Sequence, residues 1–206
     1  MLRIQLNIFL KIANAITWAL LVTTQMAGCG MAGIPFTGQV IDAITGKPIE
    51  GTIVIAMWTG ASGLVESRSV CYHVETATSD KDGQFHIPGW INPAGPFALR
   101  RHVFTIAYKP GYEGEQGKRY FVDKIDMELF KGDKHERLEY LESAVSHECF
   151  NDDYREQLIP YTKAIYEEAV SLQATPGDMA IVKSIKYHLD VLEAGWDAAR
   201  KAHIEN

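Results

Sequence analysis

Two stretches of alternating hydrophobic and polar residues, joined by a short turn, follow the N-terminal segment. In residues 36–42 every second side chain falls on one face, and residues 52–58 are rich in β-branched side chains. Both patterns are typical of β-strands. Between them, Gly46 can adopt a positive φ and Pro48 lacks an N–H donor, which suits a turn. The pattern predicts that residues 36–54 form the first hairpin of a β-sandwich.

Further turn-punctuated strands follow. In residues 76–87, a polar segment ending at Gly83 separates two strand-like runs, and a type I turn with this glycine in the left-handed conformation accounts for it. An EF-hand calcium loop is excluded because its later ligands and its flanking helices are missing. Residues 102–108 and 119–129 complete the strands, the latter with core positions at Tyr120, Val122, Ile125 and Met127. Short strands without crossover helices favour an antiparallel sandwich.

From residue 134 the hydrophobic spacing changes to three and four residues, which is typical of amphipathic helices. Three helices are predicted, with stripes at Leu138, Leu141, Val145 and Cys149, at Leu158, Ile165, Ala169 and Leu172, and at Ile181, Ile185, Leu189 (or His188), Leu192 and Trp196. Pro160 must begin, bend or break the second helix. Thr175 is the expected N-cap of the third helix, with Pro176 at its first position.

The strand region also resembles a known family through glycine, proline and strand residues in a fixed order. These residues are Gly38, Val40, Asp42, Thr45, Gly46, Pro48, Ile49, Gly51, Val54, Thr78, Asp80, Gly83, Phe85, Ile87, Tyr108, Gly111 and Tyr112. Together they resemble the carboxypeptidase regulatory-like domain, which implies a transthyretin-like antiparallel β-sandwich and a non-catalytic accessory role. Residues 59–72 are longer than a simple hairpin needs, and residues 90–101 contain Pro and Gly. Each stretch is either a binding loop or a plain surface excursion.

Charge narrows the class of partner. The chain of 206 residues has a formal net charge of −6, so a nucleic-acid partner, which needs clustered Lys and Arg, is not expected. Residues 131–206 hold 15 acidic and nine basic residues. Such an excess forms either solvated helix faces or an acidic docking surface.

The N-terminus has the layout of a bacterial secretory signal. Arg3 and Lys11 precede an uncharged run that ends in Met26-Ala27-Gly28-Cys29. Small residues just before a cysteine resemble the bacterial lipobox. In that motif the cysteine side chain is diacylated, the peptide is cut before the cysteine, and the new amino terminus is then acylated. The sequence therefore predicts a lipid anchor at Cys29, while an uncleaved membrane anchor and cleavage after Gly33 are the alternatives. By analogy with enterobacterial sorting, Gly30 after the cysteine indicates the outer membrane.

The other two cysteines, Cys71 and Cys149, form an even pair in a compartment that permits disulfides. We predict that they bond and join the first helix to the sandwich, the alternative being two buried free thiols. A metal site near His73 and His147 would need reduced cysteines, so no metal is expected.

Little else in the sequence indicates chemistry. No acid–base pair, nucleophile elbow or phosphate loop is identifiable, and no cofactor is expected. Trp58, Trp90, Tyr108 and Tyr112 are either core residues or an aromatic platform for sugar or peptide, in which Trp90 and Tyr112 would bind the ligand.

The expected organisation is a signal peptide (residues 1–28), a tether (29–33), a sandwich (34–130) and an acidic helical extension (131–206). The fold class is mainly β with an α extension. The leading hypothesis is a non-catalytic lipoprotein, facing the periplasm, that binds or braces an envelope protein partner at the membrane. A carbohydrate- or peptide-binding lipoprotein is the alternative, and an envelope hydrolase is the third hypothesis.

Overall fold

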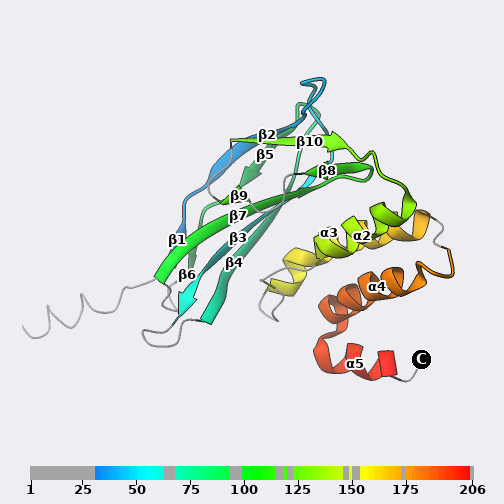
Figure 1. Cartoon of the computed structure of the whole chain (residues 1–206). Coiled ribbons are helices and arrows are strands. Elements are labelled where there is room, and N and C mark those ends of the chain that lie inside the picture. The colour runs from blue at the N-terminus through cyan, green and yellow to red at the C-terminus, as the bar shows by residue number, and fades with distance from the viewer. Residues whose placement is uncertain are drawn as a thin grey trace, which may run out of the picture. The chain divides into compact units, whose positions relative to one another are not determined.

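The computed structural model describes residues 31–62, 68–92, 99–114, 118–119, 123–145, 149, 154–172 and 175–204 (Figure 1). The strands are β1 Met31–Gly33, β2 Phe36–Asp42, β3 Ile53–Ser62, β4 Arg68–Thr78, β5 Gln84–Ile87, β6 Trp90–Asn92, β7 Leu99–Tyr108, β8 Tyr112–Gly114, β9 Lys118–Arg119 and β10 Lys124–Leu129. The helices are α2 Lys134–Val145, α3 Arg155–Ser171, α4 Met179–Ala194 and α5 Trp196–Ile204. Strand and helix shares are similar, about 39% and 37%, so the fold is mixed α and β rather than mainly β.

The chain divides into two compact units. The described part of the smaller unit is β1 with Ile91 and Asn92, and the larger unit holds the other described residues. In the larger unit, one sheet has the order β5-β2-β10-β8 and the other has the order β4-β3-β7-β9. Separately, β1 and β6 form a two-stranded sheet. Within the two four-stranded sheets, neighbouring strands run antiparallel except for β2 and β10, which run parallel. Among the helices that the structure describes, none combines the length and the hydrophobicity that a membrane span requires.

The predicted first hairpin is wrong, although its turn and its alternation are right. The chain turns tightly after β2. Gly46 N donates to Asp42 O, and Pro48 forms an isolated antiparallel β-bridge with Ile41. Gly46 has a φ of 68°. The chain then leaves the sheet at Gly51, so β2 and β3 lie in different sheets. A sequence pattern specifies which face of a strand is buried but not which strand is its neighbour.

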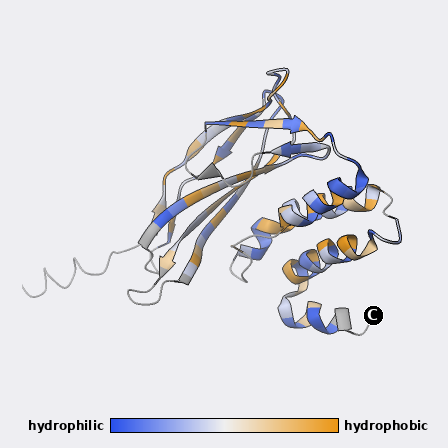
Figure 2. Cartoon of the chain, in the orientation of Figure 1, coloured by the Kyte–Doolittle hydropathy of each residue, from blue (hydrophilic) through white to orange (hydrophobic). Residues whose placement is uncertain are grey.

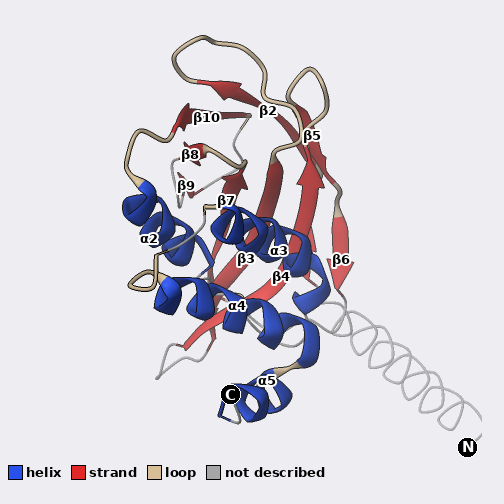
Figure 3. Ribbon diagram, turned by 90° about the vertical axis from the view of Figure 1, so that its right-hand side faces the viewer, coloured by secondary structure: helices blue, strands red, loops and turns tan. Residues whose placement is uncertain are grey.

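Both faces of β3 are buried, which makes its sheet the central layer of the larger unit. Val54, Ala56 and Trp58 lie on one face, where the Trp58 ring packs against Phe36 of the other sheet at 6.5 Å. Ile55 and Met57, on the opposite face, share a core with α2, α3 and α4. Figure 3 shows these helices across the face of β3, β4 and β7. Hydrophobic and hydrophilic residues mix along the helices (Figure 2), as expected for elements with one buried face.

Residues 59–72 are not a loop for most of their length, because β3 and β4 form one long antiparallel pair. Its register shifts between Trp58, opposite His73, and Thr59, opposite Cys71. Tyr72 is therefore an extra residue, a β-bulge. Without the bulge, strict alternation along β4 would point the Cys71 side chain away from the helices, on the same face as His73.

The turn at Gly83 forms as expected, with a φ of 72°, and Gly111, in the turn between β7 and β8, has a φ of 78°. Ile125 and Met127 are buried on β10, whereas Tyr120 and Val122 lie outside the described residues. Gly83 also approaches β2 so closely that a Cβ there would lie 2.4 Å from Val40 O. A larger residue at this turn would force the two strands apart.

The helical stripes are confirmed in part. Most predicted stripe residues are buried, and Pro160 lies inside α3. Thr175 is not the N-cap: α4 begins after Asp178, and Thr175 bonds the Asp178 carboxylate. Trp196 does not continue α4, because Gly195, with a φ of 88°, ends that helix and Trp196 starts α5 with 48% of its surface exposed.

Candidate functional site at the helix–sheet junction

A buried ion pair joins the first two described helices. Arg137 of α2 donates from Nε to Oε1 of Glu168 on α3 at 3.0 Å, and from Nη2 to Oε2 at 2.9 Å. The two side chains are only 4% and 8% exposed. This fork geometry suits Arg and carboxylate and fixes the two helices relative to each other.

The same ion pair also holds the central sheet. Tyr108 at the end of β7 donates its hydroxyl to Glu168 Oε2 at 2.6 Å, and Gly111 N donates to Oε1 at 3.0 Å. Arg137 Nη1 donates to the main-chain oxygen of Tyr112 at 2.8 Å. Burial, and then the bond to Glu168, raise the pKa of Tyr108, so its hydroxyl stays a neutral donor. The cluster of Tyr108, Arg137 and Glu168, here called the junction, therefore links α2, α3 and β7.

Two aromatic rings complete the surroundings of Arg137. Its guanidinium carbon lies 5.0 Å from the Phe130 ring centroid and 4.9 Å from that of Tyr140. Cation–π contacts of this kind partly replace the lost hydration of a buried cation. Every polar partner named here is used to hold elements together, which is the pattern of a structural fastener.

A second polar contact joins the starts of α2 and α4. His135 Nδ1 lies 2.7 Å from Asp178 Oδ1, and Nε2 lies 3.4 Å from Glu139 Oε1. Thr175 donates its hydroxyl to Asp178 Oδ2 at 2.6 Å. Because carboxylates only accept, the doubly protonated imidazolium satisfies both sides of the ring. The bond to Asp178, with the Glu139 charge, raises the pKa of His135, while Thr175 and then His135 lower the pKa of Asp178.

These shifts predict a pH-dependent stability. The raised pKa of His135 adds stability that is complete below about pH 6.5 and is lost as the pH rises through the folded-state value. The lowered pKa of Asp178 adds stability that is present above about pH 4 and is lost in stronger acid. We expect His135→Gln to lower the thermal midpoint more at about pH 6 than at about pH 9. Thermal unfolding followed by circular dichroism at both pH values measures this.

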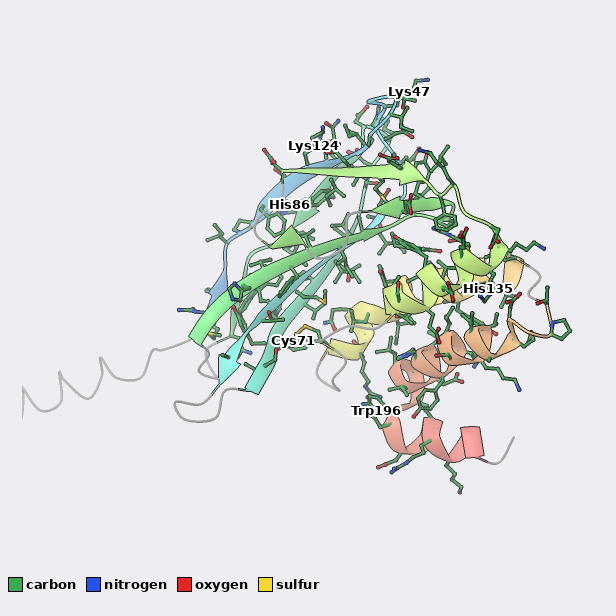
Figure 4. All side chains as sticks on the ribbon, in the orientation of Figure 1. Lys47, Cys71, His86, Lys124, His135 and Trp196 are labelled. Atoms are coloured by element: carbon green, nitrogen blue, oxygen red, sulfur yellow. A yellow bond between two sulfur atoms is a disulfide. The ribbon has the colours of Figure 1, made fainter. Side chains whose placement is uncertain are left out.

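His86→Gln, at an exposed position of β5 (Figure 4), is the matched control and should show the same small change at both pH values. An equal effect of His135→Gln at the two pH values would contradict the assignment of an imidazolium at this contact.

The predicted disulfide is confirmed. Cys71 and Cys149 are bonded with a Cα–Cα distance of 5.1 Å and a sequence separation of 78. The bulge at Tyr72 turns Cys71 toward the helical face, where Cys149 is fully buried. Cys149 follows α2 and His135 lies near the start of α2, so the disulfide to β4 and the contact with Asp178 lie at opposite ends of this helix. Figure 4 labels Cys71 and His135.

The structure does not bring Trp90 and Tyr112, the predicted ligand-binding residues, onto the same sheet. Trp90 is 8% exposed and packs on Trp58 at 5.5 Å and, stacked, on His73 at 4.1 Å. Tyr112 is half-buried on β8, and its main-chain oxygen accepts from Arg137. Trp58 and Tyr108, the other residues considered for an aromatic platform, are buried. A ligand role for Trp90 and Tyr112 stays a prediction.

Cys29, the predicted lipidation site, lies outside the described residues, as does His147. Among the residues that the structure describes, no group of three or more His, Cys, Asp or Glu is placed to hold a metal ion.

Sequence reasoning missed the junction, although a signal for it exists. Arg137 stands four residues before the buried Leu141, and Glu168 stands three residues after the buried Ile165. Both charges thus fall on the hydrophobic stripe of their helix, where an unpaired charge would be costly.

A comparison with protein-family models, curated proteins and solved structures found no match to this chain.

Proposed function

We propose that this protein is a non-catalytic lipoprotein of the bacterial cell envelope, with Cys29 as its acylated residue and an envelope protein as its partner. The two four-stranded sheets would form a transthyretin-like sandwich that supports the helices, and the helices would present the binding surface. The lipobox-like sequence before Cys29 supports the anchor, and Gly30 favours the outer membrane facing the periplasm.

The observation that carries the interaction role is the closed junction. Arg137 and Glu168 are almost completely buried, and their polar atoms are engaged by Tyr108, Gly111 and Tyr112. Such an arrangement favours a rigid joint over a reaction centre, because a reacting group must reach its substrate. A joint of this kind is useful where helices must keep a fixed orientation on a sheet.

The exposed side of the helices supports a polar docking surface. Acidic and basic side chains are mixed on this exposed side: Glu136, Glu139, Glu156, Glu167, Glu193 and Asp197 stand exposed together with Lys134, Lys163, Lys183, Arg200 and Lys201. Charge complementarity of this sort steers association and selects partners. The acidic excess of residues 131–206, 15 acidic against nine basic residues, favours a partner that carries a basic surface.

The test is capture of the partner from crosslinked membranes. We expect the intact protein to recover one envelope protein, and the double variant Glu167→Lys/Glu193→Lys to reduce recovery about tenfold or more, because reversed charges repel a basic surface. Quantitative mass spectrometry of the captured proteins measures the change.

Asp82→Lys/Asp123→Lys is the matched control, since it makes the same change of charge at exposed positions in the turn before β5 and the bend before β10. Equal loss with both double variants, or recovery of no single envelope protein, would contradict the interaction role of the helices.

A further inference from the structure

Ile91 is the most exposed large hydrophobic residue among the described residues. It lies in β6, which pairs with β1 in the two-stranded sheet. Its exposed fraction is 80%, whereas Met31 and Trp90 of the same sheet are 5% and 8% exposed. Full burial of an isoleucine side chain contributes about 1.5–3 kcal/mol, so an apolar surface that covered Ile91 would gain free energy of that size.

The position of Ile91 is tied to that of Cys29 through the chain. Met31, the first residue of β1, is two residues after Cys29, so their Cα atoms are at most about 7 Å apart. β1 is three residues long, and neighbouring strands lie about 5 Å apart. The backbone of Ile91 is therefore within about 20 Å of the Cys29 Cα.

Charge does not oppose a membrane at this sheet. Residues 29–41 contain no Asp, Glu, Lys or Arg, and neither do Trp90, Ile91 and Asn92. The acidic excess lies instead in residues 131–206. Anionic headgroups repel carboxylates, so an uncharged stretch beside the anchor suits a lipid surface.

We propose that the sheet formed by β1 and β6 contacts the bilayer and that Ile91 enters its interfacial region. This inference rests on the proposed function, because Ile91 is held close to the membrane only if Cys29 is acylated and anchored there. The acyl chains hold the protein on the membrane, and the Ile91 contact sets the orientation of the small unit on it.

Photocrosslinking tests this contact. The acylated protein, with p-benzoylphenylalanine in place of Ile91, is reconstituted into vesicles of phosphatidylethanolamine and phosphatidylglycerol and illuminated. Ile44 is the matched control position, because it is also an exposed isoleucine, at 64%, but lies in the turn after β2 and not in the sheet next to Cys29. We expect about tenfold more lipid adduct at position 91 than at position 44, as an inserted side chain meets acyl chains that a solvated one does not.

Mass spectrometry of the mature N-terminus separates the two ways of failing. With acylated Cys29, equal lipid adducts at positions 91 and 44, or adducts at 91 only to protein, would overturn this inference and leave the proposed function standing. A Cys29 without acyl chains would overturn both. Acylated Cys29 with adducts concentrated at position 91 is the supporting result.

Discussion

Arg137→Ala is expected to lower the free energy of unfolding by about 3–5 kcal/mol, since it leaves the buried Glu168 carboxylate without its cation. Glu168 would retain the hydrogen bonds from Tyr108 and Gly111, but these neutral donors do not balance a charge in a buried site. Urea unfolding followed by tryptophan fluorescence measures the loss.

Two further variants distinguish the effect of breaking the buried ion pair from the effect of removing any arginine. Arg200→Ala removes an arginine whose pair with Asp197 is 70% and 97% exposed, and it should change stability by less than about 1 kcal/mol. Adding Glu168→Gln to Arg137→Ala should restore part of the loss, because an amide is cheaper to bury and its oxygen still accepts from Tyr108. If Arg137→Ala and Arg200→Ala behave alike, the junction does not fasten the helices.

Removal of the disulfide is expected to have an effect of similar size. Replacing both cysteines, as Cys71→Ala/Cys149→Ala, opens a crosslink across 78 residues and should lower the free energy of unfolding by about 4 kcal/mol. The reason is that the unfolded chain gains the freedom that the bond had removed. Urea midpoints of the oxidised protein and the double variant measure the difference.

A reductant provides the internal control for this prediction. Dithiothreitol should lower the midpoint of the unaltered protein toward that of the double variant and should leave the variant unchanged. A double variant as stable as the oxidised protein would mean that the bond adds nothing to the fastening of Cys149 onto β4.

Several features of this protein are determined by local sequence. The alternation in residues 36–42 predicts the buried face of β2, and Gly38, Val40 and Asp42 are indeed its buried positions. The glycines at positions 46, 83 and 111 adopt the positive φ that their turns require. The three-to-four spacing places Leu138, Leu141 and Val145 in the core. Each of these depends on backbone geometry within a few residues, which is why sequence alone reveals it.

The disulfide was predictable from the sequence in part only. An even number of cysteines besides Cys29, in a chain whose sequence predicts export, predicts the bond between Cys71 and Cys149. Only the structure shows how the two cysteines meet: the bulge at Tyr72 moves the Cys71 side chain to the face of the sheet that packs on the helices. A bulge depends on the partner strand and has no firm signature in one sequence.

The remaining features were decided by contacts between distant segments. β2 pairs with β5 and β10 rather than with β3, although β3 follows it in the chain. The Arg137 and Glu168 charges lie on stripes that sequence reading assigns to the core, and they are tolerated there only because folding brings them together with Tyr108. Sequence thus determined which faces are buried and where the chain turns. Tertiary structure decided which buried faces meet, because a buried charge or a strand edge is satisfied only by the partner that the whole fold supplies.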